Sequence, residues 1–226
     1  MKRVMCAMGV ATALLMSVAP AMAQTAGGTT PSANAPSVNL VYVGGFAGIG
    51  AVQNSSTLTG GEAGVRVYRN LDIVVEGGFV KDAVTRRRID LTASLATLLQ
   101  KSTGKTASSD VTAPAKFGLA GVRYVFDLNG DFHAYVLAEA GRASIEYKPT
   151  FSVNGTDVTN SLASYGTTLG SDLVSTEAVP AFGGGLGIWY TRGMVYADAS
   201  VRLLSIRTAS QATNVTRAQF GLGVRF

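Results

Sequence analysis

The chain has 226 residues, of which 47% are hydrophobic and 15% are charged, and glycine occurs 27 times. Its 19 lysines and arginines exceed its 14 acidic residues, which gives a net charge of +5. Removal of Lys2 and Arg3 with an N-terminal leader would leave +3, so charge offers little support for nucleic acid as a partner. The mixture of apolar residues, glycines and few charges suits amphipathic strands better than helices.

Residues 1–23 have the pattern of a secretory signal peptide. Lys2 and Arg3 precede an apolar run, and residues 21–23 form a small-x-small cleavage site. The alternative is a transmembrane anchor, but the apolar run is too short for one. Cleavage would remove Cys6, the single cysteine. The exported chain would then have no disulfide, no cysteine metal ligand and no cysteine nucleophile.

Residues 24–37 are small and polar and include Pro31 and Pro36, which predicts a flexible linker without a fold of its own. After this linker one pattern recurs: glycine, an aliphatic residue, arginine or tryptophan, and then an apolar or aromatic residue. Successive side chains of a strand point to opposite faces, so each copy predicts a strand with one apolar and one polar face. The four copies lie at 64–68, 121–124, 187–190 and 221–226.

Eight strands are expected between residues 38 and 226. Short and long connections alternate between them, which is the layout of an outer-membrane barrel with short periplasmic turns and longer extracellular loops. The sequence therefore predicts an all-β fold, an eight-stranded antiparallel up-and-down transmembrane β-barrel. The predicted strands span 38–51, 61–68, 71–81, 116–126, 132–147, 178–190, 194–207 and 215–226. The predicted tight turns are 69–70, 127–131 and 191–193, and the longer polar connections are 53–60, 82–115, 148–177 and 210–214.

The polar face of these strands is expected to line the barrel interior. In a soluble barrel or sandwich the same strands would expose their arginines to water, but the alternating loop lengths favour a membrane barrel. The many glycines of the polar face favour it too, because they would keep a narrow lumen clear for large side chains. Aromatic residues near the tight turns would then form a periplasmic girdle. The girdle residues are Tyr68, Tyr124, Phe126, Trp189, Tyr190 and Phe226.

Charged residues of the polar face predict an ion-pair network inside the lumen, because a charge kept from water needs a partner. Counting through short turns places Gly64 opposite Glu76, and Gly185 opposite Asp198. Eight strands enclose just enough space for side chains, which favours a structural plug over a small gated ion path. The predicted network comprises Arg66, Glu76, Arg123, Glu139, Asp198, Arg202, Arg217 and Arg225.

The signal peptide, the repeated glycine-valine-arginine-aromatic strand ends, the segments 75–79 and 135–141, and the terminal Phe226 together carry a resemblance. They resemble the small outer-membrane β-barrel family of Gram-negative bacteria, of the OmpA, OmpX and opacity-protein type. The resemblance implies an outer-membrane location and makes Phe226 the mark read by the barrel assembly machinery. It implies no particular activity, because the family includes anchors, adhesins and host-factor binders.

The sequence shows no motif that carries enzyme chemistry. His133 is the single histidine, and no activated nucleophile accompanies it, so an enzyme is not expected. No metal cluster and no phosphate-binding loop are recognisable, so no metal and no cofactor are expected.

The connection 82–115 contains a basic cluster and leucines spaced three and four apart from Leu91 to Leu98, which predicts a short amphipathic helix. The helix either caps the barrel or presents a patch for lipopolysaccharide phosphates or another anion, since arginine suits bidentate phosphate contacts. The patch comprises Arg86, Arg87, Arg88, Lys101 and Lys105.

The function expected from these features is that of a non-enzymatic outer-membrane barrel of a Gram-negative bacterium, which contributes to envelope integrity or presents loops for binding. Its expected partners are outer-membrane lipid and lipopolysaccharide, the barrel assembly machinery during biogenesis, and an extracellular ligand. The alternatives are an adhesin or ligand binder, a narrow ion pore, and a hydrolase at the barrel rim.

Overall fold

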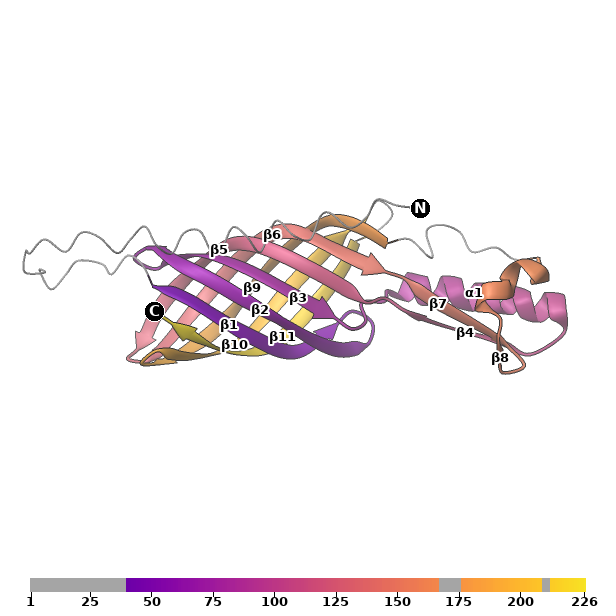
Figure 1. Cartoon of the computed structure of the whole chain (residues 1–226), viewed down its shortest axis with the longest axis horizontal. Coiled ribbons are helices and arrows are strands. Elements are labelled where there is room, and N and C mark those ends of the chain that lie inside the picture. Colours follow the sequence, from indigo (N-terminus) through magenta and orange to yellow (C-terminus); the bar gives the residue numbers. More distant parts are fainter. Residues whose placement is uncertain (1–39, 167–175, 209–211) are drawn as a thin grey trace, which may run out of the picture. The chain divides into compact units, whose positions relative to one another are not determined.

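The computed structural model describes residues 40–166, 176–208 and 212–226. The expected signal peptide and linker lie outside the described residues. Eight strands form a closed antiparallel barrel in which neighbours in the chain are neighbours in the wall (Figure 1). The predicted fold class is confirmed. The barrel strands are β1 (Val41–Ala51), β2 (Ser55–Tyr68), β3 (Leu71–Val80), β5 (Ala115–Asn129), β6 (Phe132–Glu146), β9 (Thr176–Arg192), β10 (Val195–Arg207) and β11 (Ala212–Arg225).

The connection between β1 and β2 is much shorter than predicted. Strand β2 begins at Ser55, so the expected polar loop at 53–60 is wrong. The segment 55–60 is rich in serine and threonine, but it pairs along β1 in one continuous register, and Leu58 from this segment is buried. Backbone pairing and one inward apolar side chain therefore outweigh the polar composition of this segment.

The two long inserts contain regular structure. The insert after β3 forms helix α1 (Arg86–Thr103) and strand β4 (Ala107–Thr112), and the insert after β6 forms β7 (Lys148–Val153), β8 (Thr156–Asp157) and the 3-10 helix η1 (Thr159–Tyr165). Helix α1 ends at Gly104, whose positive φ of 65° is the left-handed conformation that favours glycine at a helix C-terminus. The predicted helix is thus present, but it is longer than the span from Leu91 to Leu98.

The inserts build on the hairpin of β5 and β6. Ala115 is opposite Ile145 in the barrel, and Thr112 is opposite Lys148 in the β4–β7 ladder, so the register continues unchanged past the barrel wall. Helix α1 packs against β4 and β7 (Figure 1). A separate apolar core joins these elements, and we call α1, β4, β7, β8 and η1 the loop subdomain. This core contains Leu99, Phe151, Val153, Val158 and Leu162.

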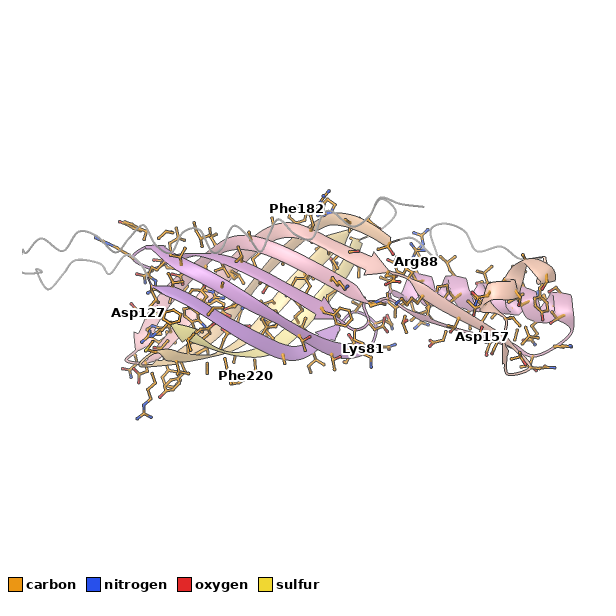
Figure 2. The ribbon with its side chains drawn as sticks, in the orientation of Figure 1. Lys81, Arg88, Asp127, Asp157, Phe182 and Phe220 are labelled. Carbon is orange, nitrogen blue, oxygen red and sulfur yellow. The ribbon has the colours of Figure 1, made fainter. Side chains whose placement is uncertain are left out.

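The barrel wall has its apolar face outside. Phe220, Leu222 and Val224 are 54%, 56% and 38% exposed, whereas Glu76 is 4% exposed in the interior. Figure 2 shows Phe220 on the outer side of the wall. The predicted assignment of the two faces is therefore confirmed.

All but one of the aromatic residues predicted for the girdle lie on the outer surface of the barrel. Tyr68, Tyr124, Phe126 and Phe226 are exposed on the outer surface, but Trp189 is buried in the interior with 3% exposure. Trp189 shares its strand face with Gly187 rather than with the outward Ile188, because side chains alternate along β9. Tyr190 faces outward and packs on Phe132, with 4.9 Å between ring centroids.

The strand register differs from the one counted through the turns. Gly64 is opposite Val74 instead of Glu76, because Tyr68 pairs with Leu71 across the turn and a bulge between Arg66 and Tyr68 shifts the register by one more residue. Gly185 is opposite Arg202 instead of Asp198. In the second case β9 continues to Arg192, and Gly193 and Met194 alone make the turn. The two registers differ from the predicted ones by two and by four residues. Because both shifts are even numbers, each side chain stays on its predicted face.

Candidate functional site

The lumen is filled by three layers of side chains. An ionic layer lies between two apolar layers, as the order along β3 and β10 demonstrates: Val74 and Tyr196 belong to one apolar cluster, and Val80 and Leu204 belong to the other. Glu76 lies between the two clusters on β3. The layer nearest the tight turns is aromatic and contains Tyr42, Val74, Val125, Tyr135, Leu137, Trp189 and Tyr196. The layer nearest the loop subdomain contains Phe46, Leu58, Val80, Phe117, Leu119, Ile145, Leu204 and Ile206, among others.

Arg202 is the centre of the ionic layer. Its Nη2 donates to Glu62 at 2.9 Å and to the Tyr135 hydroxyl at 3.1 Å, and its Nη1 donates to Glu76. Asp198, four residues earlier on β10, lies 3.8 Å away and accepts a hydrogen bond of 2.6 Å from Tyr135. A fully buried guanidinium thus contacts three carboxylates, which offset the cost of removing its charge from water.

The other two buried arginines of the lumen connect this centre to both apolar layers. Arg123 donates to Glu62 at 2.9 Å and stacks on the Tyr135 and Trp189 rings at 4.3 and 4.6 Å. Arg217 donates to Glu76 at 2.7 Å and stacks on Phe117 of the opposite layer. These cation–π contacts replace part of the hydration that the guanidinium groups lose inside the barrel.

Two arginines of the predicted network lie outside it. Arg66 forms a separate pair with Asp72 at 2.7 Å. The Arg225 Nε donates to the Gly193 carbonyl oxygen at 2.8 Å, so this residue braces the β9–β10 turn instead of contacting a lumen carboxylate. The side chain of Arg225 has the correct direction, but it lies too close to the strand end to reach the ionic layer.

Glu139 is the remaining predicted acid, and the structure places it at the margin of the layer. Its Oε2 lies 3.9 Å from Arg217 Nη2, which is within ion-pair range but beyond hydrogen-bond length. Sequence reasoning missed Glu62 and Asp72. Glu62 has the same strand parity as Gly64 and Arg66, and Asp72 has the parity of Glu76, so alternation alone could have placed both.

The predicted basic patch on the loop subdomain is not one cluster. Arg88 is buried, and its guanidinium lies 4.3 Å over the Tyr147 ring. Arg86 pairs with Asp90 at 3.3 Å, while Arg87 is exposed. Lys101 lies fifteen residues after Arg86 on the same helix, about 22 Å away at 1.5 Å per residue, and Lys105 follows the helix end. The structure therefore does not bring these five residues together.

The buried face of α1 is also not the leucine stripe that the sequence suggested. Thr92, Ala96 and Leu99 are buried with Arg88, while Leu91 and Leu98 are 39% and 56% exposed. Helix α1 therefore presents two leucines of the predicted apolar stripe to the outside of the loop subdomain.

Asp127, His133 and Thr191 make contacts like those of a hydrolase triad, but the hydroxyl-bearing residue is buried. The His133 Nδ1 is 2.8 Å from Asp127 Oδ1, and the His133 Nε2 is 3.2 Å from Thr191 Oγ1. However, Thr191 is 3% exposed, and its hydroxyl also lies 3.4 Å from the Asp131 carbonyl oxygen. The arrangement joins the β5–β6 turn to the end of β9 and offers no exposed nucleophile.

Comparison with known proteins finds no matching family model and no matching curated protein. Among solved structures, the chain is similar to Neisserial surface protein A, with 15% identity, a TM-score of 0.48, and coverage of 83% of this chain and 95% of that one. It is similar to the N-terminal β-barrel domain of OprF from Pseudomonas aeruginosa, with 17% identity, a TM-score of 0.45, and coverage of 84% and 98%. It is also similar to the outer membrane protein Ail of Yersinia pestis, with 12% identity, a TM-score of 0.40, and coverage of 84% and 99%. The fold itself is established by the closed strand ladder.

In 40–166, 176–208 and 212–226, no three or more His, Cys, Asp or Glu side chains are grouped so as to hold a metal ion. Within the same ranges, no helix has the length and hydropathy required to cross a bilayer.

Proposed function

We propose that this chain is a non-enzymatic integral outer-membrane barrel protein. Its side-chain-filled lumen gives the barrel a structural role in the membrane, and its loop subdomain faces the extracellular side. The observation that carries the proposal is the inversion of the wall: charged groups are buried inside, and large apolar side chains are exposed outside. In water such a surface would be unfavourable, because monomeric soluble proteins rarely expose large contiguous apolar patches.

The height of the apolar surface supports a membrane span. The outward positions of β10 from Val195 to Ser205 carry no charged residue, and Arg207 follows. Ten residues at about 3.3 Å each cover about 33 Å along the strand, which at a tilt of about 40° rises about 25 Å. This rise equals the usual apolar band of an outer-membrane barrel.

The lumen supports a structural role better than a pore. Permeating ions would have to cross two apolar layers, one aromatic and one aliphatic, on either side of an ionic layer whose arginines are already paired. We therefore expect purified protein in planar bilayers to give no discrete single-channel currents. Regular current steps that remain after removal of contaminating porins would support the pore instead.

Ligand binding by the loop subdomain is a second candidate function. The subdomain has its own core and a helix with exposed Leu91 and Leu98, so its surface is ordered before any partner arrives, which lowers the entropic cost of binding. If the loop subdomain binds a ligand, deletion of residues 86–103 should abolish the adhesion of cells to a surface coated with that ligand, while the barrel remains folded.

Phe226 is the residue for which we propose a role in barrel assembly. Phe226 closes the barrel seam through reciprocal backbone hydrogen bonds with Val41 of 3.2 and 2.8 Å, and its ring is exposed. We propose that this exposed ring is recognised by the barrel assembly machinery. We expect Phe226→Ser to lower the amount of barrel in outer membranes of cells, while the purified variant still refolds in detergent.

The proposed function is tested by fractionating cells and running the outer-membrane fraction on a gel with and without boiling. A folded barrel migrates differently unless it is boiled, and the protein should stay with the membrane after high-salt and alkaline washes. Recovery in the soluble fraction, or identical migration under both conditions, would contradict the proposal.

A further inference from the structure

Three basic side chains form a patch on the outer wall at the end nearest the loop subdomain. Arg142 on β6 is opposite Pro180 on β9, and the β9–β10 register brings Arg207 next to the same proline. Lys116 on β5 lies one diagonal step from Arg142, because Arg142 is opposite Gly118. All three side chains are exposed, and we call them the rim cations.

The rim cations are not neutralised by a described neighbour on this part of the wall. Among the described side chains at this end, the outward acid Glu146 pairs with Lys148 at 3.3 Å. The Arg207 guanidinium lies 5.7 Å over the Phe182 ring, and Figure 2 shows Phe182 on the outer side of the barrel. A stacked guanidinium keeps its hydrogen-bond donors available, so the patch suits a phosphate group.

A groove of about 470 Å³ lies on the same wall, across β9, β10, β11 and β1. Small outward residues form its floor, and larger apolar residues form its sides. Ala199 lies between Ile188 and Phe220 in one row, and Ala218 lies between Val201 and Ile49 in the next. The groove therefore arises from alanines set among large side chains on the face that we assign to hydrocarbon.

The height difference between the groove and the rim cations matches the hydrocarbon thickness of one leaflet. Val201 in the groove and Arg207 at the rim are six residues apart on β10, about 20 Å along the strand. At a tilt of about 40° this distance is a rise of about 15 Å, which is half of a hydrocarbon core of about 30 Å. A lipid whose phosphate lies at the rim cations would thus bring its chain ends to the level of the groove.

We propose that the rim cations and the groove form a binding site for one anionic lipid of the outer leaflet. Arg142, Arg207 and Lys116 hold its phosphate, and an acyl chain lies in the groove at Ala199. The inference rests on the membrane span proposed above, and it places the lipid site on the barrel wall rather than on the arginines of α1. Two sources supply this chemistry, the lipid A phosphates of lipopolysaccharide and an anionic phospholipid.

The headgroup half is tested with Arg142→Gln/Arg207→Gln. The matched control is Arg87→Gln/Arg192→Gln, which removes the same charge from two exposed arginines away from the patch. Purified protein in neutral detergent is titrated with lipid A or with phosphatidylglycerol, and bound lipid is counted by native mass spectrometry. Loss of charge-assisted hydrogen bonds should weaken binding about tenfold or more relative to the control. Tighter binding of one lipid by the wild type identifies the source.

The acyl-chain half is tested with Ala199→Phe, which fills the groove. Ala197→Phe is its control, since Ala197 lies two residues away on the same face and is not part of the groove lining. We expect Ala199→Phe to weaken lipid binding severalfold and Ala197→Phe to leave it unchanged. Equal binding in each pair, with all variants heat-modifiable and in the outer membrane, would overturn the lipid site alone. Absence of the wild type from the outer membrane would instead overturn the proposed function.

Discussion

Removal of the Glu76 carboxylate should be strongly destabilising, because this group joins two buried arginines. Its oxygens accept hydrogen bonds from Arg202 and, at 2.7 Å, from Arg217, and all three side chains are inaccessible to solvent. In Glu76→Ala, Arg202 keeps Glu62 as a partner, but Arg217 keeps only the distant Glu139. Breaking a buried pair from one side typically costs about 3–5 kcal/mol, and we expect a loss of that size.

The assay is urea unfolding of the refolded barrel in detergent, with the folded fraction read from heat-modifiable gel mobility. Glu146→Ala is the matched control, because it deletes the same group from an ion pair with Lys148 that is about half exposed. Exposed pairs contribute about 0–1 kcal/mol, so the control midpoint should hardly move. An unchanged midpoint for Glu76→Ala would refute the view that the lumen pairs hold the barrel together.

Three further predictions concern other parts of the structure. Gly121→Ala should lower stability by about 1–3 kcal/mol, because a Cβ there would overlap the Ala138 carbonyl; Gly118→Ala on the same strand meets open space and should be neutral in the same urea titration. Phe151→Ala should make the loop subdomain sensitive to limited proteolysis, since Phe151 is 1% exposed in its core, while the barrel stays heat-modifiable; coupled loss of both would contradict a separate core. His133→Ala should lower the unfolding midpoint, since its contacts are structural. Mass spectra of lipid A should be the same from cells that express the wild type and from cells that express the variant. A change in lipid A composition caused by the wild type but not by the variant would reveal an enzyme.

Strand alternation was enough to predict the barrel and its two faces. Glycine and arginine repeated on one face and valine or phenylalanine on the other specify which side meets hydrocarbon, once the wall is closed. Strict alternation also places Glu62 and Trp189 inside the barrel. The prediction omitted Glu62 from the lumen and assigned Trp189 to the outer girdle because it did not follow this alternation. Phe220 and Leu222 needed no information beyond their position in the strand.

Register and pairing could not be read from the sequence. The pairing of Tyr68 with Leu71 and a one-residue bulge between Arg66 and Tyr68 together move one hairpin by two residues from the counted register. Arg202 contacts Glu76 across the lumen, between residues far apart in the chain, so alternation identifies both as inward without showing that they meet. Arg88 was misplaced for a similar reason, because only the folded loop subdomain brings the Tyr147 ring to it.

The central claim is that lipid, rather than protein, touches the outer wall, and the single tryptophan of the chain allows a direct test. Trp189 lies inside the lumen, and Leu222 lies outside at 56% exposure. The wild type and the double variant Trp189→Phe/Leu222→Trp are reconstituted into bilayers containing brominated lipid, and the quenching of tryptophan fluorescence is compared. We predict strong quenching for the outward tryptophan and weak quenching for Trp189. Stronger quenching of Trp189 than of the tryptophan at position 222 would contradict the account.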